Sequence, residues 1–293
     1  MPAYLEILRR HGFTFDKAKG QNFLVAPGVC PRMAAAGAAA GVLEIGPGAG
    51  ALTRELAKSS QKVVAVELDK RLLPVLDETL AGLDNVTIIP GDILALDLPA
   101  LLKEQFAGMP VSVCANLPYY ITSPVLMRLL ELRLPLSRIT VMVQKEAAQR
   151  LCAPMGTRAC GAVTAVVEYF TEAKQLFPVS RSSFVPPPKV DSAVIQLTLR
   201  DAPAVAVADE AAFFRLVRAA FGQRRKTLAN AVSAGLSLEK SRVQEALARA
   251  GIPQTARAEE LTLQNFAALF EQLGTDAEKS SSNNRTPSDT KAV

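Results

Sequence analysis

The stretch Glu44-Ile45-Gly46-Pro47-Gly48-Ala49-Gly50 decides the fold. It follows a short aliphatic run and precedes a segment with helical spacing, so it is typical of a turn from a strand into a helix. Glycines in such a turn let a ligand approach the backbone at the carboxyl edge of a sheet. The stretch therefore predicts a nucleotide-type cofactor site.

On both sides of this turn, short β-branched runs alternate with helical stretches over residues 42–143. This alternation indicates repeated βα units and a mostly parallel sheet. We expect strands near residues 42–45, 62–67, 86–89, 110–115 and 138–143, and helices near 51–59, 70–81 and 122–132. Residues 192–199 predict a further strand, a hairpin arm at the sheet edge, whereas residues 161–177 fit either a helix or a strand.

A second, smaller domain is expected after this sheet. Residues 201–209 have little periodicity and are typical of a linker, and apolar residues then recur at helical spacing over residues 210–273. We expect a cofactor-binding domain over residues 1–200, a helical domain over 209–273 and a disordered tail over 274–293. The tail is poor in apolar groups that could offset its ordering entropy.

Composition narrows the classes of protein. About half of the 293 residues are apolar, enough to bury a full core. The 4 cysteines have no CxxC spacing and there is 1 histidine, which argues against a metal site and favours a reducing compartment. With no run of roughly 18 apolar residues, we expect a soluble, cytoplasmic protein. The net charge of +5 favours a polyanionic partner.

Acidic residues follow the next two predicted strands. Glu67 ends the second strand, where a carboxylate accepts both hydroxyls of a ribose. Asp92 follows the third strand and could accept a hydrogen bond from an adenine amino group. Together with Gly46, these strand ends would contact one adenosine. The glycines and Ala51 also match the looser G-x-G-x-x-G/A pattern, so a nicotinamide cofactor remains an alternative.

The fourth strand ends in Asn116-Leu117-Pro118-Tyr119. Hydride transfer with a nicotinamide cofactor gives no reason for this sequence at the end of the strand. An adenine amino group is a poor nucleophile because its lone pair is conjugated into the ring. If the Asn116 oxygen and the Leu117 carbonyl accept its two hydrogens, the nitrogen becomes pyramidal and aims its lone pair at an electrophilic methyl group. Pro118 makes this backbone rigid. An ordinary strand-ending turn is the simpler alternative.

Two aromatic rings are candidates to hold an extruded base. Tyr119 can stack on one face, and Phe184 in Ser182-Ser183-Phe184-Val185-Pro186-Pro187-Pro188 can cover the other. Core packing is the simpler explanation for Phe184. Near the N-terminus, Lys19-Gly20-Gln21-Asn22-Phe23-Leu24 could close over the cofactor as a lid.

Cationic residues mark the candidate phosphate-binding surfaces. Arg224, Arg225 and Lys226 are clustered beside an aromatic residue in the helical region, although a helix end would look similar. Arg181 and Lys189 flank the proline-rich segment. These five residues are the expected RNA contacts.

The ordered motifs resemble the ribosomal RNA adenine N6-dimethyltransferases, specifically the small-subunit enzymes that dimethylate two adjacent adenosines near the 3′ end of 16S rRNA. The resemblance covers residues 19–24, 44–50, 67, 91–92, 116–120, 182–191 and 221–230. It implies a Rossmann-like fold, S-adenosylmethionine as donor, and rRNA in the immature 30S subunit as partner. We expect a monomer, because the sequence has no long heptad repeat or exposed apolar strand that asks for a partner chain. The implied cofactor contacts are Asn22, Leu24, Gly46, Glu67, Asp92 and Asn116, and the implied base pocket is Asn116, Tyr119 and Phe184.

Two alternatives remain open within this resemblance. Relatives that methylate large-subunit RNA and confer macrolide resistance share the sheet motifs, but residues 184–192 and 224–228 favour the small-subunit branch. The other alternative is a ribosome assembly factor whose binding to an immature particle is its main role and whose methylation is secondary.

Overall fold

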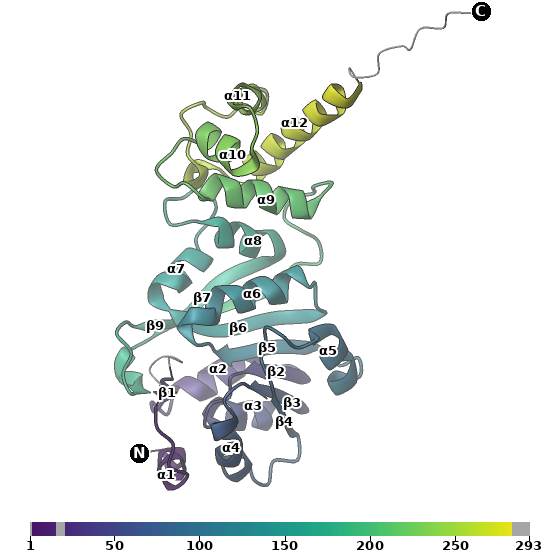
Figure 1. Cartoon of the computed structure of the whole chain (residues 1–293). Coiled ribbons are helices and arrows are strands. Elements are labelled where there is room, and N and C mark those ends of the chain that lie inside the picture. Colours follow the sequence, from purple (N-terminus) through teal and green to yellow (C-terminus); the bar gives the residue numbers. More distant parts are fainter. Residues whose placement is uncertain (1, 16–20, 283–293) are drawn as a thin grey trace, which may run out of the picture. The chain divides into compact units, whose positions relative to one another are not determined.

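The computed structural model describes residues 2–15 and 21–282 of the chain (Figure 1). The described chain forms two compact units. The first contains the described residues up to Cys152 together with Phe170–Ala202, and the second contains Ala153–Tyr169 and the described residues from Pro203 onward. The sequence analysis placed residues 153–169 in the first domain. They belong to the second unit, where the Tyr169 ring packs against Phe213 in a tilted and against Phe214 in an edge-to-face arrangement, with ring centroids 5.8 and 5.0 Å apart.

The first unit is built on a seven-stranded sheet with the order β4-β3-β2-β5-β6-β9-β7, which confirms the expected Rossmann-like α/β fold. The strands are β2 (Gly41–Ile45), β3 (Lys62–Glu67), β4 (Val86–Pro90), β5 (Val111–Asn116), β6 (Leu136–Gln144), β7 (Thr171–Val179) and β9 (Ser192–Leu199). Strands β2 to β6 pair in parallel, and β9 pairs antiparallel with both β6 and β7.

The expected place of β9 at the sheet edge is wrong. Strand β9 lies between β6 and β7, and the edge strand is β7. The ambiguous segment 161–177 divides into a helix, α8 (Ala162–Phe170), and the first part of β7. Most of β9 is buried, whereas β7 alternates between buried and exposed residues, as an edge strand with one solvated face does. Its weaker apolar pattern is why the sequence alone left this segment undecided.

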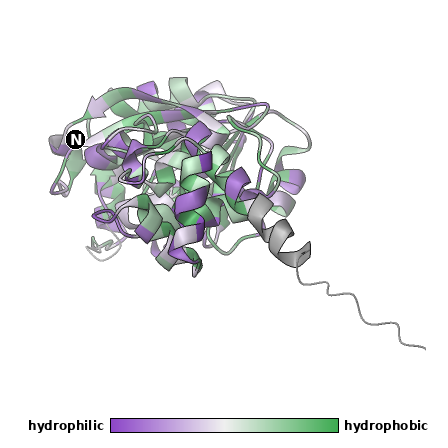
Figure 2. Cartoon of the chain, turned by 90° about the horizontal axis from the view of Figure 1, so that it is seen from above, coloured by the Kyte–Doolittle hydropathy of each residue, from purple (hydrophilic) through white to green (hydrophobic). Residues whose placement is uncertain are grey.

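Helices cover the sheet and carry both hydrophilic and hydrophobic residues, as amphipathic helices on a core do (Figure 2). They are α1 (Ala3–Arg10), α2 (Val29–Gly37), α3 (Ala51–Ser59), α4 (Leu73–Thr79), α5 (Leu98–Phe106), α6 (Thr122–Glu131) and α7 (Lys145–Leu151). Two short strands, β1 (Phe23–Leu24) and β8 (Phe184–Val185), form a separate antiparallel ribbon. A 3₁₀ turn, η1 (Lys70–Leu72), occupies the start of the helix expected over residues 70–81.

The strand order brings four carboxyl ends to one edge of the sheet. After β2 the chain moves outward through β3 and β4, then returns to the other side of β2 as β5. The edge at β2 is therefore the point where the order reverses, which is where open α/β sheets bind ligands. Gly46, Gly48 and Gly50 follow β2 with φ angles of 68°, 60° and 81°. These angles suit glycine and disfavour residues with a side chain.

The second unit is helical. Besides α8 it contains α9 (Glu210–Phe221), α10 (Leu228–Leu236), α11 (Lys240–Arg249), the 3₁₀ turn η4 (Ala258–Glu260) and α12 (Leu263–Ser282). Phe213, Phe266 and Leu247 are fully buried in it. The tail expected from residue 274 begins inside α12, which continues to Ser282 because a single glycine at 274 is tolerated within a helix. Residues 283–293 lie outside the described residues.

Among the described residues, no helix is both long enough and apolar enough to cross a membrane.

The packing of α2 on β5 sets the position of the strand that carries Asn116. A Cβ atom at Gly37 would lie 2.7 Å from Cys114 Sγ and 2.9 Å from Cys114 Cβ. Gly37→Ala should lower the free energy of unfolding by about 1–3 kcal/mol, because helix and strand must separate. Denaturant unfolding followed by circular dichroism measures this.

The matched control is Gly274→Ala, also inside a helix but with nothing within 4 Å of the added Cβ. Gly274 lies inside α12 and Gly37 is the last residue of α2, so alanine should gain at least as much helix propensity at the control site, and Gly274→Ala should leave stability unchanged or raise it by up to about 1 kcal/mol. A similar response of the two variants would contradict the account of close packing.

Candidate functional site

A cavity lies at the carboxyl ends of β2, β3, β4 and β5. The strand ends and the turns that follow them form most of its wall, and residues of α1, α2, α3, β1 and β8 also line it. We call it the strand-end cavity. It brings together Gly46, Glu67, Asp92 and Asn116, which lie far apart in the sequence.

The glycine turn forms one side of the cavity. Gly46 N–H donates to the Val66 carbonyl at 2.9 Å and Gly50 N–H donates to the Pro47 carbonyl at 2.9 Å, so the turn is tied to β3 and to itself. A Cβ atom at Gly46 would meet nothing within 4 Å. The backbone therefore borders open space, and a ligand can lie directly against it.

Glu67 is buried at the end of β3, with 6% of its surface exposed. Its Oε2 accepts from Gly48 N–H at 3.2 Å and its Oε1 accepts from Asp69 N–H at 2.8 Å. Desolvation raises the pKa of this carboxyl, and the two backbone donors oppose that shift. Each oxygen keeps a further lone pair for a ligand hydroxyl.

Asp92 lies in the turn after β4 and is exposed. Its Oδ1 accepts from Leu94 N–H at 2.9 Å, and its own carbonyl accepts from Ala95 N–H at 2.9 Å. The side chain is therefore oriented by the turn while it lines the strand-end cavity.

Asn116 ends β5 and is half-buried at the cavity wall. Within the described part of the chain, no group hydrogen-bonds with its side-chain amide. The backbone carbonyls of the two residues that follow differ in their hydrogen bonding. The Pro118 carbonyl accepts from Ile121 N–H at 3.1 Å, whereas the Leu117 carbonyl has no donor among the described residues. The Leu117 side chain is buried, so only its backbone can reach a ligand.

Tyr119 lies in the 3₁₀ turn η2 (Tyr119–Ile121), half-buried, and its hydroxyl is 2.8 Å from Ser192 Oγ at the start of β9. This hydrogen bond holds the ring in place at the cavity. Desolvation raises the pKa of the Tyr119 hydroxyl, so it stays neutral at physiological pH.

Phe184 also lines the cavity but is only 3% exposed and packs in the core beneath it. It belongs to β8 and pairs with Leu24 of β1. Asn22 and Leu24 line the same cavity. Lys19 and Gly20 of the expected lid lie outside the described residues, while Gln21 donates to Asp69 Oδ2 at 2.9 Å.

The expected RNA contacts are exposed. Arg224 pairs with Glu259 at 3.8 Å in the helical unit, beside Arg225 and Lys226. In the first unit, the Arg181 backbone N–H donates to Asp191 Oδ1 at 3.0 Å, and its guanidinium donates to the Lys189 carbonyl at 3.4 Å.

Two polar residues of the cavity that were not expected from the sequence carry a buried oxygen without a partner among the described residues. Glu44 in β2 is 1% exposed, and among the described residues no partner reaches its Oε2. Burial raises the pKa of this carboxyl to about 8, and the neighbouring Glu67 raises it too. Nearby Thr53 lowers the pKa, but by less than burial raises it. Glu44 is the first residue of the stretch Glu44–Gly50, but only the structure shows that its carboxylate has an unsatisfied oxygen.

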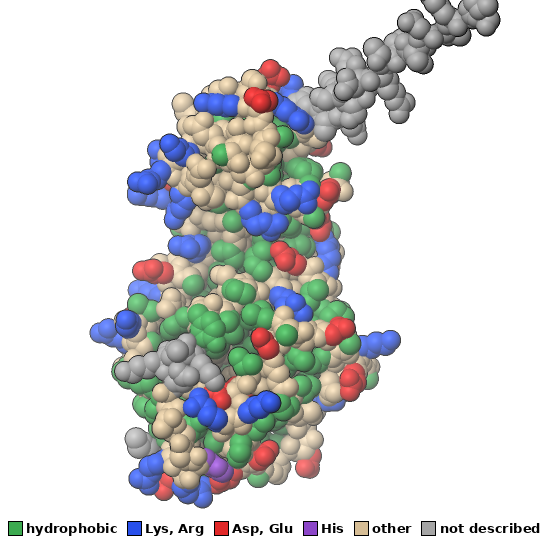
Figure 3. Space-filling model, viewed as in Figure 1, with side chains coloured by type: hydrophobic (Ala, Val, Ile, Leu, Met, Phe, Trp, Pro, Cys, Tyr) green, Lys and Arg blue, Asp and Glu red, His purple; other side chains and the backbone are tan. Residues whose placement is uncertain are grey.

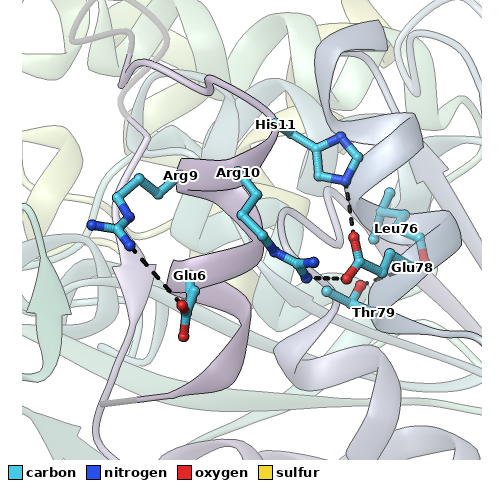
Figure 4. Close-up of polar contacts among 7 residues, drawn as sticks. All are labelled: Glu6, Arg9, Arg10, His11, Leu76, Glu78 and Thr79. Atoms are coloured by element: carbon cyan, nitrogen blue, oxygen red, sulfur yellow. Dashed lines mark hydrogen bonds and ion pairs between the residues drawn. The ribbon is translucent and has the colours of Figure 1, made fainter.

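Tyr4 is the other such residue, and α1 carries it to the cavity. Arg10 and His11 at the end of α1 bind Glu78 of α4, with His11 Nε2 3.0 Å from Glu78 Oε2 (Figure 4). These bonds lower the pKa of Glu78, the His11 bond most of all. The Tyr4 hydroxyl is buried without a partner among the described residues. Only the packing of α1 shows that Tyr4 lies at the cavity, because a single tyrosine is not part of any recognisable sequence motif.

No cluster of three or more metal-ligating side chains occurs within residues 2–15 and 21–282.

The buried carboxyl of Glu44 predicts a pH dependence of stability in the protein without cofactor. Its pKa is about 8 when folded and 4.5 ordinarily, so between these values the folded state holds a proton that the unfolded chain has lost. The resulting stabilisation is complete below pH 4.5 and is lost as the pH rises towards 8. Relative to Glu44→Gln, the wild type should lose on the order of 3–5 kcal/mol across this window.

Urea unfolding of both proteins at intervals from pH 5 to pH 8.5 measures the difference. Glutamine keeps the shape of the side chain without the titration, so it isolates Glu44 from other groups. If the free energy of unfolding changes with pH in the same way for both proteins, Glu44 does not have a raised pKa in the folded state.

Comparison with known proteins agrees with this geometry. Residues 12–274 match the sequence family described as ribosomal RNA adenine dimethylase. Ribosomal RNA small subunit methyltransferase A of Anoxybacillus flavithermus is 48% identical over 275 residues, covering 92% of this chain and 93% of the relative. The protein of the same name from Bacillus licheniformis is also 48% identical, covering 92% and 94%.

Two solved structures are similar over most of the chain. A dimethyladenosine transferase from Plasmodium falciparum is 27% identical, with a TM-score of 0.70, covering 86% of this chain and 98% of that one. The 23S rRNA methyltransferase ErmE is 28% identical, with a TM-score of 0.66, covering 86% and 100%. The resemblance noted in the sequence is confirmed, and the chain belongs to the ribosomal RNA adenine dimethylase family.

Proposed function

We propose that this protein uses S-adenosylmethionine to dimethylate N6 of adenosines in small-subunit ribosomal RNA. The observation that carries the proposal is the Asn116 amide, which has no hydrogen-bond partner among the described residues and shares one cavity with the glycine turn and the Glu67 carboxylate. Relatives 48% identical and named small subunit methyltransferases support this branch of the family. The 23S rRNA enzyme is only 28% identical, so the large-subunit alternative has less support.

The residues of the strand-end cavity fit this cofactor. Open space beside Gly46 admits a ligand against the backbone, and the two Glu67 oxygens retain lone pairs for the ribose hydroxyls. Asp92 would accept from the adenine amino group, with Asn22 and Leu24 closing the other side. The unsatisfied Oε2 of Glu44 suits a cation, and the cofactor carries both an ammonium and a sulfonium group.

When bound, this cofactor supplies an electrophilic methyl group on a sulfonium sulfur. The amide oxygen of Asn116 and the carbonyl of Leu117 would accept the two hydrogens of the adenine amino group and free its lone pair. As the methyl is transferred, positive charge grows on the nitrogen, and these two oxygens stabilise it. The amide is neutral, so the proton leaves afterwards to water rather than to a strong base.

The base itself would be held by stacking. The Tyr119 ring, fixed by the hydroxyl contact with Ser192 at 2.8 Å, would lie against one face of the extruded adenine. Because Phe184 is only 3% exposed, it would cover the other face with little more than a ring edge. Leu117 and Pro118 would act through their backbone, which sets the distance between Asn116 and Tyr119.

The finer substrate is also part of the proposal. We expect two adjacent adenosines near the 3′ end of 16S rRNA in an immature 30S subunit, modified in the cytoplasm by a monomer. Lys and Arg side chains are spread over the face shown in Figure 3, among them residues of the helical unit. Phosphate contacts would come from Arg181, Lys189, Arg224, Arg225 and Lys226, and they would position a folded RNA rather than identify its bases.

Asn116→Ala tests this role directly. Loss of one preorganised acceptor for the amino group should lower the rate of methyl transfer at least about 100-fold. Binding of S-adenosylmethionine, measured by calorimetry, should remain detectable, because Glu67 and the glycine turn are intact.

Tyr119→Phe serves as the control within the same turn. It keeps the ring but removes the hydroxyl bonded to Ser192, so transfer should fall by about tenfold or less. An Asn116→Ala enzyme with a near-normal rate would refute the proposed role of the amide.

A further inference from the structure

The two tyrosines of the turn after β5 differ sharply in exposure. Tyr119 is half-buried and held by Ser192, whereas Tyr120 is 56% exposed, although both residues line the strand-end cavity. Tyr119 forms part of the inner wall of the cavity. Tyr120 therefore presents an aromatic ring at the mouth of the same cavity.

The fold does not depend on the Tyr120 side chain. The turn is closed by Ile121 N–H donating to the Pro118 carbonyl at 3.1 Å, and by the buried Thr122, whose hydroxyl donates to the same carbonyl at 3.4 Å. Single exposed apolar side chains are common on protein surfaces, whereas exposed apolar side chains grouped around a groove are typical of a ligand-binding surface. Of the large hydrophobic side chains described as exposed, the two most exposed, Tyr120 at 56% and Leu68 at 54%, both border this cavity.

We infer that Tyr120 is a stacking platform for the base next to the adenosine whose amino group Asn116 holds. The inference rests on the proposed function and adds a contact to the substrate. A nucleotide extruded into the cavity stays tied by its phosphodiester to a neighbour, which must lie at the mouth. That neighbour has lost its stacking partner, and an exposed aromatic ring replaces it for any base, because every base has a π-face.

This contact acts on binding rather than on chemistry. Tyr120 touches neither the amino group nor the methyl donor in this arrangement, so it is a substrate-binding residue and not a catalytic one. Tyr120→Ala should raise KM for undermethylated small subunits more than it lowers kcat. Tyr120→Phe, which keeps the ring, should behave like the wild type.

The decisive experiment pairs changes in the protein with changes in the RNA. The affinity of each protein is measured for a short single-stranded RNA with a central adenosine, and for the same RNA with both neighbours abasic. Tyr120→Ala should weaken binding of the intact RNA about 5- to 150-fold, the range measured when a base loses an aromatic partner. The same variant and the wild type should bind the abasic RNA alike.

Leu132→Ala is the matched control, since Leu132 is an exposed apolar residue, 39% exposed, that does not border the cavity. It should match the wild type on both RNAs. The inference is overturned if Tyr120→Ala binds the intact RNA like the wild type, if its loss is equal on both RNAs, or if the wild type does not distinguish them. Failure of the proposed function gives a separate result, a wild-type protein that transfers no methyl group to small subunits.

Discussion

The site depends on the reversal of strand order at β2. Because β3 and β5 pair in parallel with opposite sides of β2, their carboxyl ends meet beside the turn that follows it. Gly46, Gly48 and Gly50 hold positive φ angles there, which leaves room against the backbone. An acidic residue from one side and an amide from the other then face the same cavity, without any loop having to cross the molecule.

Burial gives this cavity its electrostatic character. Glu44 and Glu67 are both buried, and burial raises the pKa of each carboxyl, while the neighbouring Glu67 raises the pKa of Glu44 further. Glu67 is stabilised by two backbone donors, whereas Glu44 is left with an unsatisfied oxygen. A cationic cofactor would supply the missing partner and allow both groups to ionise.

Much of the fold was predictable from the sequence, because the core strands are mostly apolar and the glycine turn is typical of the step from a strand into a helix at a cofactor site. The edge of the sheet was not predictable. Strand β7 alternates between buried and exposed residues, so residues 161–177 have no clear hydrophobic periodicity, and β9 was wrongly placed at the edge. The strand-end residues Glu67, Asp92 and Asn116 were recognisable because they follow apolar runs. Glu44 and Tyr4 were not, since their significance lies in unpartnered buried oxygens that only packing creates.

The account is tested most directly by transfer of labelled methyl groups from S-adenosylmethionine to undermethylated small subunits, large subunits and naked rRNA, followed by mapping of the modified bases. We predict label as N6-dimethyladenosine at two adjacent positions near the 3′ end of small-subunit RNA. Label confined to large-subunit RNA would contradict the assignment of substrate. An absence of label in all three, despite tight cofactor binding, would contradict the role given to Asn116 and its neighbours.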